Sequence, residues 1–278
     1  MRHLLIIIHS RKLKCMKHLS KVLLFLTIAS LAITSCSKQA KEETNDEISQ
    51  AIKNQIYELG FSTNDIQKID EGYLIEGDIV LTEASLNEKP TSPLLRIAEV
   101  EQYNTFNLVT GGTRTITVSS SGNVNTSVSN AIDAAIARYN NENLLLSFQR
   151  VNNGGDINIK IVNGGSFIAS SGFPSGGNPF PEVKFNKKFQ NNSSGFLTTV
   201  IAHEIGHCIG FRHTDYMNRS FSCGTGGNEG QETTGVGAVH IPGTPTGPDA
   251  ASWMLACLSS ATDRPFNTND KTALNFLY

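Results

Sequence analysis

The chain lacks an excess of charge of either sign. It carries 23 Lys and Arg against 25 Asp and Glu, which gives a net charge of −2 at pH 7. Binding to nucleic acid or to an anionic membrane surface depends on clustered positive charge, so we expect neither as a partner. Charged residues form only 17% and hydrophobic residues 39% of the 278 residues, which is typical of a globular protein with one or two domains.

The chain also lacks an apolar run that is long enough to cross a bilayer. The stretch from Val22 to Ile33 follows three lysines but holds only twelve residues, whereas a spanning helix needs about 20. Basic residues, a short apolar run and then small residues are the order found in signal peptides. We therefore expect an export signal here and no membrane-spanning helix later in the chain.

Cys36 comes directly after the small residues that end this region. The arrangement resembles the lipobox of bacterial lipoproteins, which implies that residues 1–36 are a lipoprotein signal peptide and that Cys36 is acylated. Met16 fits the start better than Met1, because initiation there gives a compact signal of ordinary length. The polar residues 37–47 would then be a tether. The resemblance implies an exported bacterial lipoprotein at the outer membrane or cell surface, in contact with the membrane only through its lipid; plain secretion is the alternative.

Residues 203–213 hold three histidines, a glutamate and a glycine at a spacing that can build a catalytic zinc site. His203 and His207 are four residues apart, so on a helix both imidazoles project from one face toward one metal ion. Gly210 can adopt the left-handed conformation that ends a helix, and the reversed chain then brings His213 back as a third ligand. Three protein ligands leave one position open for water. We therefore expect one catalytic Zn²⁺.

Glu204 lies beside these ligands and is the candidate general base. Zinc lowers the pKa of a bound water from about 15.7 to about 7, and a nearby carboxylate can pass the released proton to the leaving amine. The pattern predicts a zinc metalloendopeptidase that acts on polypeptides. The alternative is a non-enzymatic surface lipoprotein that uses the zinc fold as a binding or adhesion scaffold, because a fold alone does not establish activity. The presence of Glu204 favours the enzyme.

The extended motif resembles that of the metzincins, in which a turn carrying a methionine follows the zinc motif. Ser252-Trp253-Met254 fits that turn, so Met254 is the Met-turn candidate. A more specific resemblance is to the bacterial dual-action HEIGH metallopeptidases, which share the stretches 203–207, 211–215 and 241–245. This resemblance implies an α+β fold, namely a metzincin-like catalytic domain with a twisted mixed sheet, a zinc-binding active-site helix and a Met-turn, preceded by a small α+β pro-segment.

This chain lacks two features that better-known families of metzincins carry. Astacins place a tyrosine two residues after the Met-turn methionine, where this chain has Ala256. Matrixins bind a second, structural zinc through histidines and aspartates before the active-site helix, where residues 167–173 offer only Ser170 and Ser171. The resemblance therefore implies a single zinc ion and no tyrosine ligand.

Periodicity and composition divide the chain after the tether into two parts. Residues 48–110 are expected to be the pro-segment and linker, and residues 111–278 the catalytic domain. The edge strand of the catalytic domain would bind extended substrate by strand addition. The expected strands lie at 73–75, 79–81, 115–118, 144–150, 157–161, 166–171 (the edge) and 183–186, and the expected helices at 48–59, 126–139, around 203–207 and at 268–278.

Cysteine is scarce outside the signal region, where only Cys208, Cys223 and Cys257 remain. An oxidising exterior permits one disulfide and leaves one thiol. We prefer a Cys208–Cys223 pair, because it would tie the active-site helix to the following loop. A Cys208–Cys257 pair would tie that helix to the Met-turn equally well, and the sequence leaves both open.

Asp78 is a candidate latency switch. The stretch 75–78 resembles the FxGD motif of astacin pro-segments, with Ile75 in place of phenylalanine. The resemblance implies that Asp78 takes the open zinc position and that the full-length chain is a zymogen. Residues 37–99 contain no cysteine, which excludes a thiolate switch of the matrixin kind. The alternative is that Gly77 and Asp78 only shape a turn in a hairpin.

Overall fold

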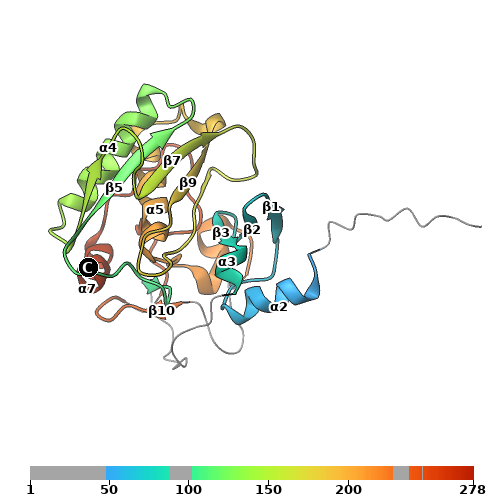
Figure 1. The fold of residues 1–278 in the computed structure, drawn as a ribbon. Helices are drawn as coiled ribbons and strands as arrows, with labels where there is room; N and C mark the ends of the chain where they lie inside the picture. Colours follow the sequence, from blue (N-terminus) through green and yellow to red (C-terminus); the bar gives the residue numbers. More distant parts are fainter. Residues whose placement is uncertain (1–47, 88–101, 228–237, 246) are drawn as a thin grey trace, which may run out of the picture. The chain divides into compact units, whose positions relative to one another are not determined.

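The structure is a computed structural model that describes residues 48–87, 102–227, 238–245 and 247–278 (Figure 1). All of these residues belong to one unit, Ile48–Tyr278. The expected signal peptide, the tether and Cys36 lie outside the described residues. Within the described ranges, no helix has the length and apolar character needed to span a membrane.

A five-stranded mixed sheet forms the centre of the fold (Figure 1). β5 (Arg114–Ser121) pairs in parallel with β6 (Leu146–Arg150) and β7 (Ile157–Val162), and β7 pairs in parallel with β9 (Glu182–Asn186). β8 (Ala169–Ser170) pairs antiparallel with β9 and forms an edge of the sheet. The expected α+β class with a mixed sheet is confirmed.

Two helices, α4 (Thr126–Asn140) and α5 (Ser194–Ile209), pack against each other and against this sheet. α4 begins at Asn125, whose side chain accepts a hydrogen bond from the backbone of the first turn, and its apolar stripe recurs at helical spacing. α5 is buried from Phe196 to Ile209, because it passes between the sheet and the rest of the fold. The two helices and the inward residues of the strands therefore share one core.

The N-terminal segment, residues 48–87, forms a separate small core beside Phe173. Its strands form an antiparallel sheet in the order β1-β2-β3, between two helices in the chain. The elements are α2 (Gln50–Glu58), β1 (Gln67–Ile69), β2 (Gly72–Ile75), β3 (Ile79–Thr82) and α3 (Glu83–Leu86). The buried side chains of this core are Ile56, Phe61, Tyr73, Ile75, Ile79, Leu81 and Leu86.

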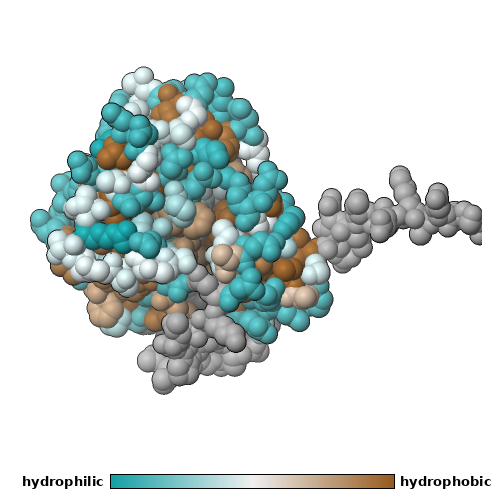
Figure 2. Space-filling view, viewed as in Figure 1, coloured by the Kyte–Doolittle hydropathy of each residue, from teal (hydrophilic) through white to brown (hydrophobic). Residues whose placement is uncertain are grey.

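Several short elements complete the fold, and most expected elements lie within a few residues of their observed bounds. The expected edge strand 166–171 is shorter in the structure, because only Ala169 and Ser170 pair with β9. Figure 2 shows hydrophilic residues over much of the visible face, with hydrophobic residues in smaller patches. The remaining elements are β4 (Tyr103–Asn104), which pairs with β10 (Val239–His240), η1 (Lys187–Phe189), η2 (Tyr216–Asn218), α6 (Ser220–Cys223) and α7 (Thr268–Leu277).

Candidate metal centre

Three histidines and one aspartate converge on one point in the structure. α5 carries His203 and His207 one turn apart, and it ends at Gly210, whose φ of 115° lies in the left-handed region. The reversed chain brings His213 back to the same point. Ligand atoms of these histidines and of Asp78 all lie within 4.8 Å of one another. The fold therefore places four groups that can bind one metal ion.

Hydrogen bonds orient two of the imidazoles toward this point. Nδ1 of His203 lies 2.8 Å from the carbonyl oxygen of Trp253, and Nδ1 of His207 lies 2.7 Å from that of Phe211. Because a carbonyl oxygen only accepts, each Nδ1 carries the proton and each Nε2 presents a lone pair to the cluster, where Nε2 of His207 lies 3.2 Å from Nε2 of His213. Neutral histidines fit the burial of the site, which together with the neighbouring histidines holds the pKa of His207 well below its usual range.

Buried polar atoms support a cation at the centre of the cluster. Nε2 of His203 and Oδ1 of Asp78 are both buried without a hydrogen-bond partner. Nε2 of His213 lies 3.2 Å from Oδ2 of Asp78. Imidazole nitrogen and carboxylate oxygen are ordinary zinc ligands, and a bound cation would satisfy the atoms that lack partners. The residues present therefore fit one zinc ion.

Asp78 comes from the turn between β2 and β3 of the N-terminal segment. Burial alone would raise the pKa of its carboxyl group, but His213 and His203 hold that pKa well below its usual range. The backbone around Asp78 pairs with the end of the edge strand. The backbone amide of Ser171 donates to the carbonyl oxygen of Asp78 (2.9 Å), and the backbone amide of Val80 donates to the carbonyl oxygen of Ser171 (2.6 Å). Asp78 thus reaches the histidines as a carboxylate on a backbone that is fixed on both sides.

Glu204 is buried beside the cluster and forms no part of it. The Ser171 hydroxyl donates to its Oε2 at 2.7 Å. Burial, followed by repulsion from Asp78, raises the pKa of Glu204 well above its usual range. A carboxyl group with a raised pKa in a cleft is suited to proton transfer near neutral pH.

Met254 lies beneath the histidine helix. Its side chain is fully buried, and a Cβ atom added at Gly206 would come within 2.7 Å of its sulfur. The helix and the turn 252–254 approach so closely that any side chain at position 206 would force the Met254 side chain to shift. Asp270 holds this turn in place. Its carboxylate accepts hydrogen bonds from the Ser252 hydroxyl at 2.8 Å and from the Trp253 backbone amide at 3.3 Å.

A cleft of about 260 Å³ opens beside Glu204 and His203. Apolar side chains from β8, α5 and the segment after Met254 line it, and two arginines add positive charge. A cleft next to the candidate base can hold a substrate side chain. Its apolar and cationic lining includes Phe167, Ile168, Ala169, Val200, Trp253, Leu255, Leu258, Arg219 and Arg264.

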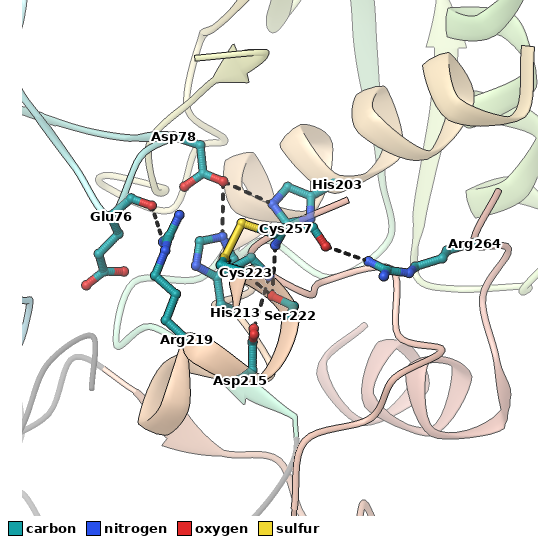
Figure 3. The surroundings of a disulfide bond; sticks show 11 residues. Glu76, Asp78, His203, His213, Asp215, Arg219, Ser222, Cys223, Cys257 and Arg264 are labelled. Carbon is teal, nitrogen blue, oxygen red and sulfur yellow. Dashed lines mark hydrogen bonds and ion pairs between the residues drawn. A yellow bond between two sulfur atoms is a disulfide. The ribbon is translucent and has the colours of Figure 1, made fainter. Parts of the chain in front are cut away.

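The disulfide corrects our expectation from the sequence. Cys223 pairs with Cys257, with Cα atoms 5.1 Å apart, as Figure 3 shows. Both pairs considered from the sequence, Cys208–Cys223 and Cys208–Cys257, are wrong. Cys208 is a free thiol in the main core, and its position on the buried face of α5 keeps it away from the other two cysteines.

Sequence reasoning missed the residues that hold Asp78 in place. Arg212 and Glu76 form a fully buried ion pair, and Ser171 connects the edge strand to Glu204. Arg212 stands within the zinc motif and Glu76 within the stretch 75–78, but the two residues are 136 positions apart in the chain. The only signal for this pair in the sequence was the presence of one charged residue inside each motif. That the two residues meet depends on the tertiary fold.

Comparison with known proteins places the chain in a peptidase family. Two structures of myroilysin are similar at low levels. The first structure shares 15% sequence identity with a TM-score of 0.42, and the match covers 62% of this chain and 96% of that chain. The second shares 16% sequence identity with a TM-score of 0.37, and the match covers 59% of this chain and 82% of that chain. No curated protein matches the chain. The model of the dual-action HEIGH metallopeptidases matches residues 73–278. The chain belongs to this family and is a zinc metallopeptidase, with a cluster of three histidines and an aspartate able to bind one ion.

Proposed function

We propose that this protein is an exported zinc endopeptidase whose full-length form is latent. His203, His207 and His213 would hold the zinc, Glu204 would act as the general base, and Asp78 would block the site until the N-terminal segment leaves. The observation that carries the proposal is the convergence of Asp78 with the three histidines. The activity itself follows from membership of the peptidase family, so the scaffold alternative is not needed.

Glu204 would handle the proton of the reaction. When bound, zinc supplies a Lewis acid that polarises the scissile carbonyl and makes a water nucleophilic near neutral pH. Glu204 would accept the proton of that water and deliver it to the leaving amine. The hydrogen bond from Ser171 fixes one carboxylate oxygen, which leaves the other for the proton.

The N-terminal segment supports latency through two contacts. Asp78 would supply an anionic oxygen ligand in place of the catalytic water, since carboxylate oxygens bind zinc in many sites. The backbone from Asp78 to Val80 also pairs with Ser171, at the end of the edge strand. Because extended peptides bind by adding to an exposed strand edge, a substrate would need the same backbone groups. The segment therefore occupies both the metal side and the strand side of the site.

Met254 would act as the Met-turn residue of the site. It supports the helix that carries the two histidines from below, and its neighbour Trp253 accepts the hydrogen bond from His203. Packing on both sides of the helix would keep the imidazoles oriented for zinc.

Export is supported by the Cys223–Cys257 disulfide, because such bonds persist in oxidising compartments. We propose that the protein is a lipoprotein attached through Cys36 and facing the cell exterior. Labelled fatty acid should be incorporated by the wild-type chain and not by Cys36→Ala. Incorporation that persists in Cys36→Ala would contradict this attachment site.

The enzymatic proposal is tested with zinc-loaded full-length protein and casein as substrate. Asp78→Ala should raise cleavage at least tenfold, because the blocking carboxylate is gone. Asp65→Ala, a change in another turn of the same segment, is the matched control and should leave the protein latent.

Two further variants separate the roles of base and ligand. Glu204→Gln in the Asp78→Ala background should abolish cleavage while zinc content, measured by atomic absorption, stays at one ion per chain. His213→Ala should lose both zinc and cleavage. Removal of zinc by a chelator should stop cleavage reversibly. Cleavage that persists in the Glu204→Gln variant would contradict the mechanism.

A further inference from the structure

Arg212 is a fully buried arginine whose carboxylate partner comes from the N-terminal segment. Its Nη2 donates to both carboxylate oxygens of Glu76, at 2.9 and 2.8 Å, and neither side chain is exposed. Its Nη1 donates to the carbonyl oxygen of Gly60 at 3.3 Å. Two residues of the segment therefore satisfy a cation that belongs to the catalytic part of the chain.

The surroundings of Arg212 form a built carboxylate site. Its guanidinium lies 4.3 Å from the centroid of the Phe61 ring and 6.0 Å from that of Tyr216. Arg219 donates to the backbone carbonyl of Glu76, as Figure 3 shows. Two arginines of the zinc-binding part of the chain, Arg212 and Arg219, thus contact the residue that carries the carboxylate.

Glu76 is held in this place against its backbone preference. Its φ of 53° lies in the left-handed region, which is costly for a residue with a long side chain. The amide of Ser62 also donates to its Oε1, at 3.3 Å. The backbone conformation would favour glycine at this position. The presence of glutamate is therefore explained by the contacts of its side chain and not by the turn.

The Arg212 site lies next to the metal centre. Glu76 precedes Asp78 by two residues, so the two carboxylates must arrive and leave together. Phe61 stacks on Phe173 with centroids 5.7 Å apart, and Phe173 meets the ring of His207 at 5.6 Å. A peptide that replaces the N-terminal segment at the histidines would therefore pass the two arginines as well.

We propose that Arg212 and Arg219 form a substrate subsite for an acidic side chain, which Glu76 fills in the full-length chain. An arginine stays protonated at every physiological pH. Departure of the N-terminal segment would remove Glu76 together with Gly60 and Phe61, and so would leave the Arg212 cation beside the active centre without its carboxylate partner. An acidic residue within a few positions of the scissile bond would restore the pair and raise the catalytic efficiency. This inference rests on the proposed peptidase function and names its substrate class.

The test uses the full chain with a recognition site for a sequence-specific protease inserted within residues 88–101. After the cut, both parts stay in solution with zinc. The substrates are matched, C-terminally amidated peptides that carry glutamate or glutamine at each position within three residues of the scissile bond. We expect kcat/KM to be at least tenfold higher for glutamate at one position, because a site built for a carboxylate rejects the neutral amide. A ratio near one at every position would overturn the proposal.

Variants assign the preference to Arg212. Arg212→Gln should reduce the ratio to within twofold of one. Lys184→Gln is the matched control, because Lys184 also pairs with an acid of the N-terminal segment, Glu71, but belongs to β9 and lies outside the zinc motif. It should leave the ratio unchanged. A preference that survives in folded Arg212→Gln would overturn the assignment.

A second measurement covers the case in which Arg212→Gln fails to fold. A synthetic peptide with the sequence of residues 72–82 should inhibit the cut wild-type enzyme, and the same peptide with glutamine for Glu76 should inhibit at least tenfold more weakly. Equal inhibition by the two peptides would overturn the proposal. If no peptide is cleaved by zinc-loaded protein, the proposed function fails instead, so the two failures are distinguishable.

Discussion

At the residue scale, Ser171 connects three parts of the site. Its hydroxyl donates to Glu204, its amide donates to the carbonyl of Asp78, and its carbonyl accepts from Val80. One buried serine therefore touches the candidate base and both ends of the blocking turn. Such a residue positions the base and does not itself react.

Ser171→Ala should lower kcat of the Asp78→Ala protein about 10- to 150-fold, because a hydrogen bond to a charged group contributes about 1.5–3 kcal/mol. The backbone contacts would remain, so KM and zinc content should change little. The measurement is steady-state cleavage of a fluorogenic peptide.

Ser170→Ala is the control for that experiment. Ser170 is equally buried, and its hydroxyl has no hydrogen-bond partner. Its replacement should leave kcat within twofold. An equal loss of kcat in the two variants would show that the effect comes from packing.

At the scale of elements, the start of α7 holds the turn that supports the metal helix. Asp270 caps α7 through the amide of Asn267 and also accepts from the hydroxyl of Ser252 and the side-chain amide of Gln102. One carboxyl group thus joins the last helix, the turn 252–254 and the chain before β4. Its charge state affects all three.

Stability should depend on pH through Asp270. Burial raises the pKa of Asp270 to about 7, whereas an unfolded aspartate has a pKa of about 3.9. Between these values the native state binds a proton that the unfolded state has released, so the free energy of unfolding should fall as the pH rises from 4 to 7. The loss attributable to Asp270 should be on the order of 2–4 kcal/mol.

Urea unfolding at pH 5 and pH 8 measures this effect, with Asp270→Asn as the reference. The amide does not ionise, so the variant should lose less stability between the two pH values than the wild type. Subtracting the two proteins removes the contribution of the histidines. The same pH dependence in both proteins would contradict the role of Asp270.

At the scale of the whole molecule, the disulfide-bonded chain after Met254 and the N-terminal segment both line the cleft beside Glu204. Cys223 and Cys257 tie the short helix α6 to the chain after Met254. The disulfide spans 34 positions of sequence, so it restrains a long loop in the unfolded chain.

The double variant Cys223→Ser, Cys257→Ser should lose about 3–4 kcal/mol of stability, which is the loop-closure entropy expected for this separation. Guanidinium denaturation with and without reductant measures it. Reductant should destabilise the wild type by a similar amount and leave the double variant unchanged, because Cys208 has no disulfide to lose. If reductant leaves the free energy of unfolding of the wild type unchanged, the prediction is wrong.

Local patterns in the sequence determined the features that depend on neighbours along the chain. The apolar period of α4, the alternation of β7 and the spacing of His203 and His207 follow from 3.6 residues per helical turn and two per strand. The zinc motif predicted the metal chemistry for the same reason, since its residues are brought together by one helix and one glycine turn. Family membership then agreed with that motif.

Only the tertiary structure decided which distant residues meet. The pairing of Cys223 with Cys257, the burial of Arg212 against Glu76 and the contact of Asp78 with the histidines all join segments far apart in the chain. The two-residue strands β4 and β10 were missed because such short strands carry no periodicity, and their pairing depends on the fold. The physical reason is common to all: a side chain's own sequence neighbours set its local conformation, but the partner of a buried charge or thiol is set by how the layers pack.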